Sequence, residues 1–322
     1  MGFTFIDLFC GIGGFRQALE SVGGVCVFSS DKNKNARLTY QANYGDMPKG
    51  DITKISAEEI PPFDVLCGGF PCQSFSIGGR QRGLNDQRGQ MIFEITRIAE
   101  YCNPKILFLE NVDNMIRLDG GRTLATILGL LEDLGYDVNY KVLAANDFGC
   151  ATIRKRLYFV CFRKDLHINF SFPEPFESDL AVEDFLDTDV DEHYFFDPAS
   201  ITFYKPDITD RIHKTYRIGY IGELRRDNSI GQGQRVYSIK GLVPTLVATS
   251  RSAAGGTESY CVNGRVRKLT PRECLRIMGF PEDFIFPVPE ARAYEQLGNS
   301  VAVPVLKLIA KQIVSTGVFS ND

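Results

Sequence analysis

The stretch FTFIDLFCGIGGFRQALESVGGVCVFSSD, residues 3–31, decides the fold class. Residues 3–9 are an apolar run of strand-forming residues that ends at a glycine turn. Residues 14–22 have helical apolar spacing, and residues 24–31 form a second apolar strand. A strand, a turn, a helix and a second strand in this order are typical of a parallel sheet covered by helices.

The following 130 or so residues continue this alternation. Apolar periodicity predicts four further strands and two further helices: strands at 63–70, 105–112, 140–149 and 156–164, helices at 88–102 and 123–136. The sequence therefore predicts an α/β fold with a doubly wound, mainly parallel, Rossmann-like sheet. In such a sheet ligands bind at the carboxyl ends of the strands.

The alternation stops near Pro173. Residues 174–197 contain ten acids and neither Lys nor Arg, which predicts a linker or an exposed edge. Residues 200–270 are rich in Gly, Arg and Ser and predict a small, irregular, β-rich domain. Thr270 and Pro271 have the residue types of a helix N-cap and first turn, and residues 300–314 predict a final amphipathic helix that packs on the first domain.

Composition excludes several classes of protein. Among the 322 residues no apolar run approaches the roughly 18 that a membrane span needs, so we expect no membrane partner. The nine cysteines form no CxxC pair and the three histidines are far apart, which disfavours a disulfide framework and a metal site. We expect a soluble cytoplasmic protein.

The charge is unevenly distributed. The net charge of −4 disfavours a nucleic-acid partner, but residues 214–276 hold twelve Lys or Arg against four acids. A basic region on an acidic chain is the footprint of a polyanion partner, or else a solvated face. Charge alone leaves both interpretations open.

The glycine turn after the first strand indicates a ligand. Gly11 and Gly13 permit close approach of the backbone, but Arg16 stands where a dinucleotide motif has its third glycine. Asp31 ends the second strand, where a carboxylate can bind ribose hydroxyls, and Asp51 could accept from an adenine amino group. This set fits a nucleoside without a pyrophosphate, S-adenosylmethionine; the alternative is a tight turn with no ligand.

The loop CGGFPCQSFSIGGRQRG, residues 67–83, places a thiol after a strand end. Cys72 follows a proline, and polar and basic side chains come next. A nucleophilic thiol needs exposure and a lowered pKa, which such surroundings favour. The alternative is an inert cysteine, the usual state of a lone thiol.

Glu110 ends the apolar strand at 105–112. A carboxylate there must be paired or functional, and burial would let it be protonated near neutral pH. A nucleophilic Cys, a protonatable Glu and a methyl donor together suit methylation at C5 of cytosine. A thiolate that adds to C6 makes C5 enamine-like, and an acid at N3 stabilises the developing charge.

At these residues the chain resembles the DNA (cytosine-5)-methyltransferases of the single-domain, restriction-modification type. The resemblance covers nearly the whole chain, in six segments: DLFCGIGGF at 7–15, GGFPCQSFS at 68–76, ENV at 110–112, RKR at 154–156, RKLTPRECLRIMGFP at 267–281 and QLGNSVAVPV at 296–305. It implies a flipped cytosine. It also implies a catalytic domain at 1–185 and 299–322, a target-recognition domain at 186–270 and a hinge at 271–298.

The resemblance assigns roles residue by residue. Cys72 is the nucleophile, Glu110 contacts cytosine N3 and Arg156 contacts the base or the attacking groups. The supporting catalytic residues are Arg154 for the loop, with Asn111 and Pro71 for the pocket. The cofactor site would comprise Phe9, Gly11, Gly13, Asp31, Asp51, Ile52, Asn299 and Ser300. The DNA contacts would come from Gln73, Ser76, Arg80, Arg82, Gln232, Arg235, Thr245 and Leu246, with phosphate contacts also from Arg225, Arg226 and Lys240.

Three positions depart from the family pattern: Thr152 where a Gln is usual, Lys32 where a Trp is common and Gly78 where a Ser can enter the DNA. The resemblance implies S-adenosylmethionine as methyl donor, S-adenosylhomocysteine as product, no metal, and double-stranded DNA as partner. We further expect a monomer in the cytoplasm of a prokaryotic cell, or encoded by a phage, and a cognate restriction endonuclease as a functional partner. The alternatives are an RNA cytosine-5 methyltransferase and a non-catalytic DNA-binding relative.

Overall fold

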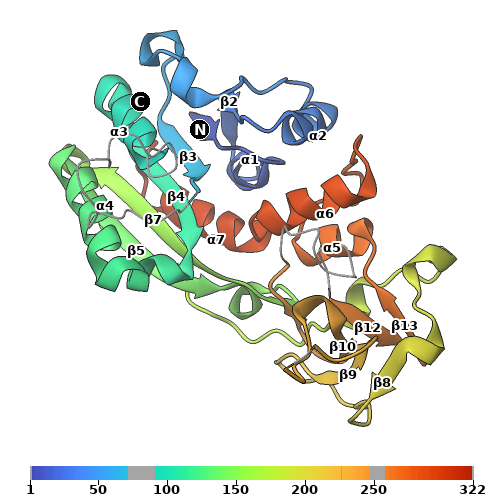
Figure 1. Ribbon diagram of the computed structural model, residues 1–322. Helices are drawn as coiled ribbons and strands as arrows, with labels where there is room; N and C mark the ends of the chain where they lie inside the picture. The colour runs from blue at the N-terminus through green and yellow to red at the C-terminus, as the bar shows by residue number, and fades with distance from the viewer. Residues whose placement is uncertain (1, 72–90, 226, 247–257, 321–322) are drawn as a thin grey trace. The chain divides into compact units, whose positions relative to one another are not determined.

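The computed structural model describes residues 2–71, 91–225, 227–246 and 258–320 (Figure 1). The chain divides into two compact units. The first comprises Met1–Leu143, Lys155–Glu174 and Leu306–Asp322, and the second comprises Ala144–Arg154 and Pro175–Val305. The range 186–270, predicted to recognise the target, lies within the second unit together with the range 271–298.

A six-stranded sheet forms the centre of the first unit, in the order β2-β1-β3-β4-β7-β5. The strands are β1 (Phe3–Leu8), β2 (Gly24–Ser30), β3 (Val65–Gly69), β4 (Ile106–Val112), β5 (Tyr136–Ala144) and β7 (Lys155–Arg163). The pairs β2-β1, β1-β3 and β3-β4 are parallel, and β7 runs antiparallel to β4. The predicted fold class, a mainly parallel α/β sheet together with a smaller β-rich part, is confirmed.

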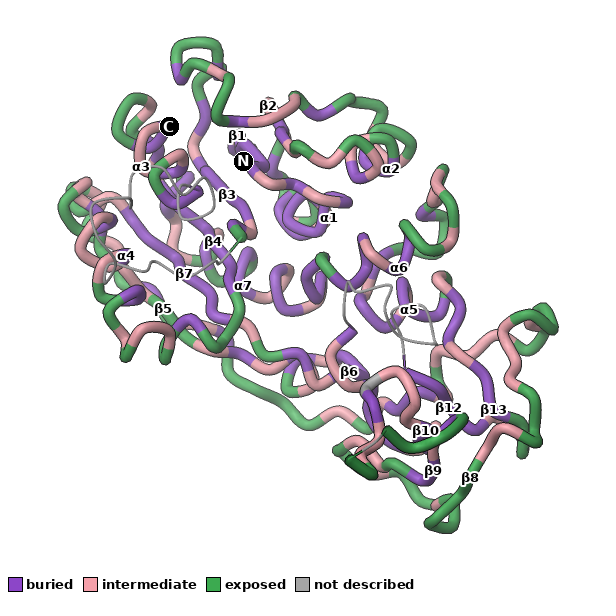
Figure 2. Tube along the Cα trace, in the orientation of Figure 1, coloured by how far each residue is buried: buried purple, intermediate pink, exposed green. Residues whose placement is uncertain are grey.

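Side-chain alternation along the strands creates two buried faces. Leu66, Leu107 and Phe159 pack in one core with apolar side chains of α3 (Met91–Cys102) and α4 (Arg122–Asp133). On the other face Phe108 meets Phe15 of α1 (Gly14–Glu20) edge to face, with ring centroids 5.0 Å apart. Burial on both faces explains why β3, β4 and β7 run purple in Figure 2 and read as nearly continuous apolar runs.

The sequence pattern missed one helix of the first unit, α2 (Lys34–Tyr44). It buries only Ala36, Thr39 and Tyr40, so its apolar stripe is too narrow to stand out as a period. Its start is nevertheless encoded locally, because the Asn33 side chain accepts from the backbone N–H groups of residues 35 and 36 at 2.9 and 3.3 Å.

The second unit contains a five-stranded sheet in the order β13-β12-β10-β9-β8 and a two-stranded sheet of β11 and β6. The strands are β6 (Thr152–Ile153), β8 (Ile201–Phe203), β9 (Arg217–Ile221), β10 (Arg235–Ser238), β11 (Val243–Pro244), β12 (Ser259–Val262) and β13 (Arg265–Lys268). One face of the larger sheet buries a small core around Ile218, Val236 and Val266. By alternation along the strands, its opposite face carries polar side chains that include Arg235 and the buried Tyr237 and Tyr260.

Helices α5 (Pro271–Ile277) and α6 (Glu290–Asn299) also belong to the second unit, and α7 (Val303–Ser315) follows them. The predicted start of α5 is confirmed: Thr270 caps it, and Glu273 completes a capping box. Glu273 also pairs with Arg267 at 2.6 Å, and both side chains are at most 1% exposed. This buried pair ties the start of α5 to β13.

The acidic segment 174–197, predicted to be a linker or an exposed edge, is mostly exposed or half-buried but is also anchored to the second unit. Ala181 and Val182 are buried, and short 3-10 turns interrupt the segment. Its acids pair with cations of the basic region: Glu183 with Lys240 at 2.7 Å and Asp187 with Arg276 at 2.7 Å. Acids and cations that are separated along the sequence therefore form ion pairs in the folded protein.

Residues Glu290–Ser315 are long and apolar enough to cross a membrane by length and composition, contrary to the expectation that no such run exists. The segment is broken between α6 and α7, at residues 300–302, and 56% of its apolar window is buried within the protein. Buried core helices of soluble proteins have the same length and apolar composition, so these two properties alone are weak evidence for a membrane span.

Candidate active site

The register of the central strands of the first unit assembles a polar group around Glu110. Glu110 lies opposite Gly69 of β3, and Val112 lies opposite Arg156 of β7. The Arg156 Nε is 2.8 Å from the Glu110 carboxylate, and the two side chains are only 12% and 10% exposed. A carboxylate in an apolar strand is costly, and this guanidinium offsets the cost.

The chain that leads toward Cys72 is fixed beside the same carboxylate. The buried Asn111 side chain donates to the Phe70 carbonyl at 2.8 Å, and Pro71 follows on the surface. A Cβ on Gly69 would lie 3.0 Å from Glu110 Oε2, so a larger residue would crowd the carboxylate. Cys72 and the predicted DNA contacts of its loop lie outside the described residues: Gln73, Ser76, Arg80 and Arg82, together with the departure Gly78.

The thiols within the described residues are poor nucleophiles. Burial raises the pKa of every one of them, to about 11 for Cys26 and to about 12 for Cys150. The same holds for the others: Cys10, Cys67, Cys102, Cys161, Cys261 and Cys274. A reactive thiolate needs the opposite shift.

The predicted cofactor turn has unusual backbone geometry. Phe9 and Gly11 both have φ near 54°, a conformation that costs energy for a residue with a side chain. The Gly11 N–H donates to Asp31 Oδ2 at 2.9 Å, and Asn33 N–H donates to Oδ1 at 2.7 Å. Burial raises the pKa of Asp31 against these hydrogen bonds. The turn after β1 is therefore clamped to the end of β2.

Gly11 and Gly13 differ in their surroundings. A Cβ built on Gly11 meets nothing within 4 Å, whereas one on Gly13 would lie 2.4 Å from the Tyr44 ring. Gly13 is thus needed for packing, and Gly11 faces open space beside the Asp31 carboxylate. Open space next to a carboxylate is what a ribose ligand requires.

No role of their own was assigned from the sequence to two residues next to this turn, Arg16 and Asp7. Arg16, buried at 8% exposure, pairs with Glu20 at 2.7 Å and Asp46 at 3.1 Å, and its guanidinium stacks over Tyr44. Asp7 is fully buried in β1, and burial raises its pKa to about 8. The argument used for Glu110, a carboxylate in an apolar strand, would also have found Asp7.

Asp51 and Ile52 end the loop after α2. Asp51 is an N-cap whose carboxylate accepts from Thr53 N and Oγ1 at 3.1 and 2.9 Å. The Ile52 side chain is buried, and its carbonyl accepts from Arg97 at 3.3 Å. Lys32, where the family often has a Trp, is exposed.

In the second unit Arg154 contacts two other predicted residues, Leu246 and Ser300, and the unpredicted Gly298. The buried guanidinium donates to the carbonyls of Leu246 and Gly298, at 3.2 and 3.1 Å, and to that of Ser300. Thr245 Oγ1 donates to the Ile153 carbonyl at 2.6 Å. Arg154 is therefore a structural clamp that joins β6 to the segment after β11 and to the end of α6.

Three further predicted positions lie in the second unit. Thr152, the departure from the usual Gln, is fully buried, and its Oγ1 donates to the Pro244 carbonyl at 3.5 Å. Asn299 is the exposed last residue of α6. Gln232 begins a 3-10 turn, Gln232–Gln234, that leads into Arg235 on β10.

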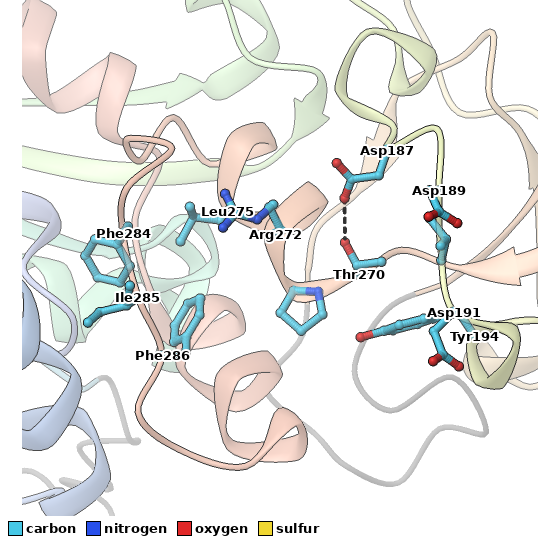
Figure 3. Close-up of a pocket in the computed structure, with 12 residues that line it drawn as sticks. Asp187, Asp189, Asp191, Tyr194, Thr270, Arg272, Leu275, Phe284, Ile285 and Phe286 are labelled. Carbon is cyan, nitrogen blue, oxygen red and sulfur yellow. Dashed lines mark hydrogen bonds between the residues drawn. The ribbon is translucent and has the colours of Figure 1, made fainter.

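A cavity of about 490 Å³ also opens in the second unit (Figure 3). Phe284, Ile285 and Phe286 line one side, and Asp187, Asp189 and Asp191 line the other. Asp187 accepts a hydrogen bond from Thr270 Oγ1 at 3.4 Å and forms an ion pair with Arg276. None of the residues that line this cavity belongs to the predicted catalytic or cofactor set.

Comparison with known proteins identifies the class. Residues 3–315 match the family model of the C-5 cytosine-specific DNA methylases. The chain is 44% identical over 318 residues to the type II methyltransferase M.HhaI of Haemophilus parahaemolyticus, covering 98% of this chain and 95% of that protein. It is 41% identical over 317 residues to M.DsaV of Dactylococcopsis salina, covering 97% and 86%.

A solved structure has the same fold. The Entamoeba histolytica methyltransferase EhMeth superposes with a TM-score of 0.74 at 20% identity, over 100% of this chain and 99% of that one. The chain therefore belongs to the C-5 cytosine-specific DNA methylase family. It is a DNA (cytosine-5)-methyltransferase of the type II, restriction-modification kind.

Proposed function

We propose that this enzyme transfers a methyl group from S-adenosylmethionine to C5 of a cytosine flipped out of a short, specific duplex sequence. The transfer proceeds through a covalent bond between Cys72 Sγ and C6 of the base. The enzyme acts as the modification partner of a restriction endonuclease. The observation that carries the proposal is the group at the end of the central strands: Glu110 paired with Arg156, beside the chain that leads to Cys72.

The residues of this group divide the chemistry. Cys72, as thiolate, adds to C6 and raises the electron density at C5. Glu110 faces N3 of the flipped base, where a proton or hydrogen bond stabilises the developing charge. Arg156 holds the Glu110 carboxylate in place, and Asn111 fixes the backbone that precedes Cys72. Loss of the C5 proton and departure of the thiolate complete the cycle.

The turn after β1 suits the cofactor. The open space at Gly11, the strained Phe9 backbone and the Asp31 carboxylate would hold the nucleoside end of S-adenosylmethionine. Gly13, Asp51, Ile52, Asn299 and Ser300 complete the proposed set. When bound, S-adenosylmethionine supplies the methyl group that C5 takes up, and S-adenosylhomocysteine is the product. No group of three or more His, Cys, Asp or Glu suited to a metal occurs among the described residues.

The second unit would supply the DNA contacts. Gln232 in the turn before β10, Arg235 on β10 and the Thr245–Leu246 pair beside Arg154 are the described residues proposed to meet the bases. Arg225 has no ion pair among the described residues and is suited to a phosphate. We place the enzyme in the cytoplasm of a prokaryotic cell, as a monomer.

The test is base-resolution conversion sequencing of DNA from a methylation-free host that expresses the protein, with Cys72→Ser as the control. We expect C5 methylation at one short motif with the parent and none with Cys72→Ser, while duplex binding by the variant is retained. Methylation by Cys72→Ser would remove Cys72 from its role. Methylation of tRNA rather than DNA would favour the RNA enzyme instead.

A further inference from the structure

The polar face of the five-stranded sheet holds a buried carboxylate next to a predicted DNA contact. Strands β10 and β12 are parallel, with Val236 opposite Ser259 and Tyr237 opposite Tyr260. Arg235 directly precedes Val236, and Glu258 directly precedes Ser259. Because side chains alternate between the two faces of a strand and Val236 lies in the apolar core, Arg235 and Glu258 are neighbours on the opposite face. The Tyr237 and Tyr260 rings, with centroids 6.1 Å apart, continue this face.

Both members of the Arg235–Glu258 neighbour pair have unsatisfied polar atoms. Glu258 is only 7% exposed, and its Oε2 is buried without a hydrogen-bond partner. Arg235 Nε is also buried without one. Buried polar atoms without partners are rare and costly, so each such atom requires an explanation. Here an unpaired donor and an unpaired acceptor lie on adjacent strands.

Two arginines and two tyrosines lie near the Glu258 carboxyl group. Burial raises the pKa of Glu258 to about 7, and the guanidinium groups of Arg235 and Arg217 oppose that shift. The phenols of Tyr237 and Tyr260 face the same site, and burial raises both of their pKa values. Glu258 is therefore the group of this face that changes charge near neutral pH.

We propose that Glu258 is a specificity-determining residue that positions Arg235 for base recognition. When DNA binds, the ionised Glu258 carboxylate accepts from the Arg235 guanidinium and holds it in one orientation against a base edge. Arginine binds guanine best, through O6 and N7, and this geometry tolerates little rotation. The inference rests on the proposed function, because it needs Arg235 to face DNA.

The experiment uses the full-length enzyme and the motif found by conversion sequencing. The ratio of kcat/KM for the motif to that for duplexes with one base pair replaced gives the discrimination at each position. We expect Glu258→Gln to reduce discrimination about tenfold or more at one G·C position and to leave the other positions unchanged. Arg235→Lys should affect the same position, and the double variant should lose no more than Arg235→Lys alone.

The pH dependence separates positioning from mere packing. Above pH 8 the parent carboxyl is ionised, and below about pH 6 it is protonated, since its pKa is raised to about 7. Discrimination by the parent at that position should therefore fall as pH decreases. With Glu258→Gln it should be low and constant. Ratios on the same enzyme cancel the pH dependence of the chemical step.

Glu223→Gln is the matched control, since it removes an equal charge from an exposed site of the same unit. Its discrimination at each base-pair position, and the pH dependence of that discrimination, should equal those of the parent. Unchanged discrimination and an unchanged pH profile in folded Glu258→Gln would overturn the proposal. If that variant does not fold, pH-independent discrimination by the parent overturns it instead. A parent that methylates no duplex motif would show that the proposed function has failed, a separate result.

Discussion

Buried carboxyl groups are stabilised in different ways in this protein. Glu110 forms an ion pair with Arg156 at 2.8 Å, and Glu273 forms one with Arg267 at 2.6 Å. Asp7 has weaker support: Cys67 Sγ lies 3.8 Å from Oδ1, and Oδ2 has no partner. A buried charge without partners is avoided by protonation, which explains the pKa of about 8 for Asp7.

Asp7→Asn should make stability less dependent on pH. The unfolded carboxyl loses its proton near pH 3.8, but the folded one keeps it up to about pH 8, so the parent loses stability as pH rises between these values. Asn lacks that titration. We expect the variant to gain several kcal/mol over the parent at pH 8, and little at pH 4. Urea unfolding at both pH values measures this; an equal loss at both would contradict it.

At the scale of elements, the buried ion pair at the start of α5 should be more important than the exposed ones. Glu273→Gln leaves Arg267 as an unpaired buried cation and weakens the capping box, so we expect a loss of roughly 3–5 kcal/mol. Glu282→Gln is the matched control, because its carboxylate is 64% exposed and pairs with Arg276 and Arg272. Its loss should stay under about 1 kcal/mol by chemical denaturation. Equal losses would refute the distinction.

The turn between β1 and α1 allows packing and ligand binding to be separated. Gly13→Ala places a methyl group 2.4 Å from the Tyr44 ring at a φ of 83°, so we expect it to destabilise the fold strongly. Gly11→Ala meets no atom within 4 Å and should cost only about 1–2 kcal/mol from its positive φ.

Calorimetric titration with S-adenosylhomocysteine tests whether Gly11 lies in the cofactor site. Folded Gly11→Ala should bind it at least tenfold more weakly than the parent, because a methyl group would occupy the space proposed for the ligand. Binding equal to that of the parent would exclude Gly11 from the cofactor site.

Across the whole molecule, ion pairing within the protein determines which Lys and Arg side chains can contact DNA phosphates. Lys240 is held by Glu183 at 2.7 Å, although the sequence predicted it as a phosphate contact. Arg225 forms no ion pair among the residues that the structure describes. Anisotropy titrations across a salt series should therefore show a steep slope of log K against log salt, reduced by about 1 in Arg225→Ala. Lys240→Ala should change it little, and an equal change would contradict this assignment.

Much of the fold could be predicted because it is encoded locally. The strands with buried faces appear as continuous apolar runs, and Thr270 and Pro271 mark the start of α5 by their chemistry alone. The narrow stripe of α2 and the pairing of the acidic segment with distant cations could not be predicted this way. Such pairs join residues up to 89 positions apart, and no local period encodes them.

The fold class, the family and the candidate residues follow from the amino-acid sequence, because short motifs with fixed spacing mark both the strand ends and the reactive side chains. How those residues are held became visible in the folded chain. Sheet register brought Arg156 to Glu110, and the folded loops made Arg154 a clamp for three carbonyls. It also left Glu258 buried beside Arg235. The physical reason is that burial and cross-strand contact depend on neighbours that the chain meets only after folding.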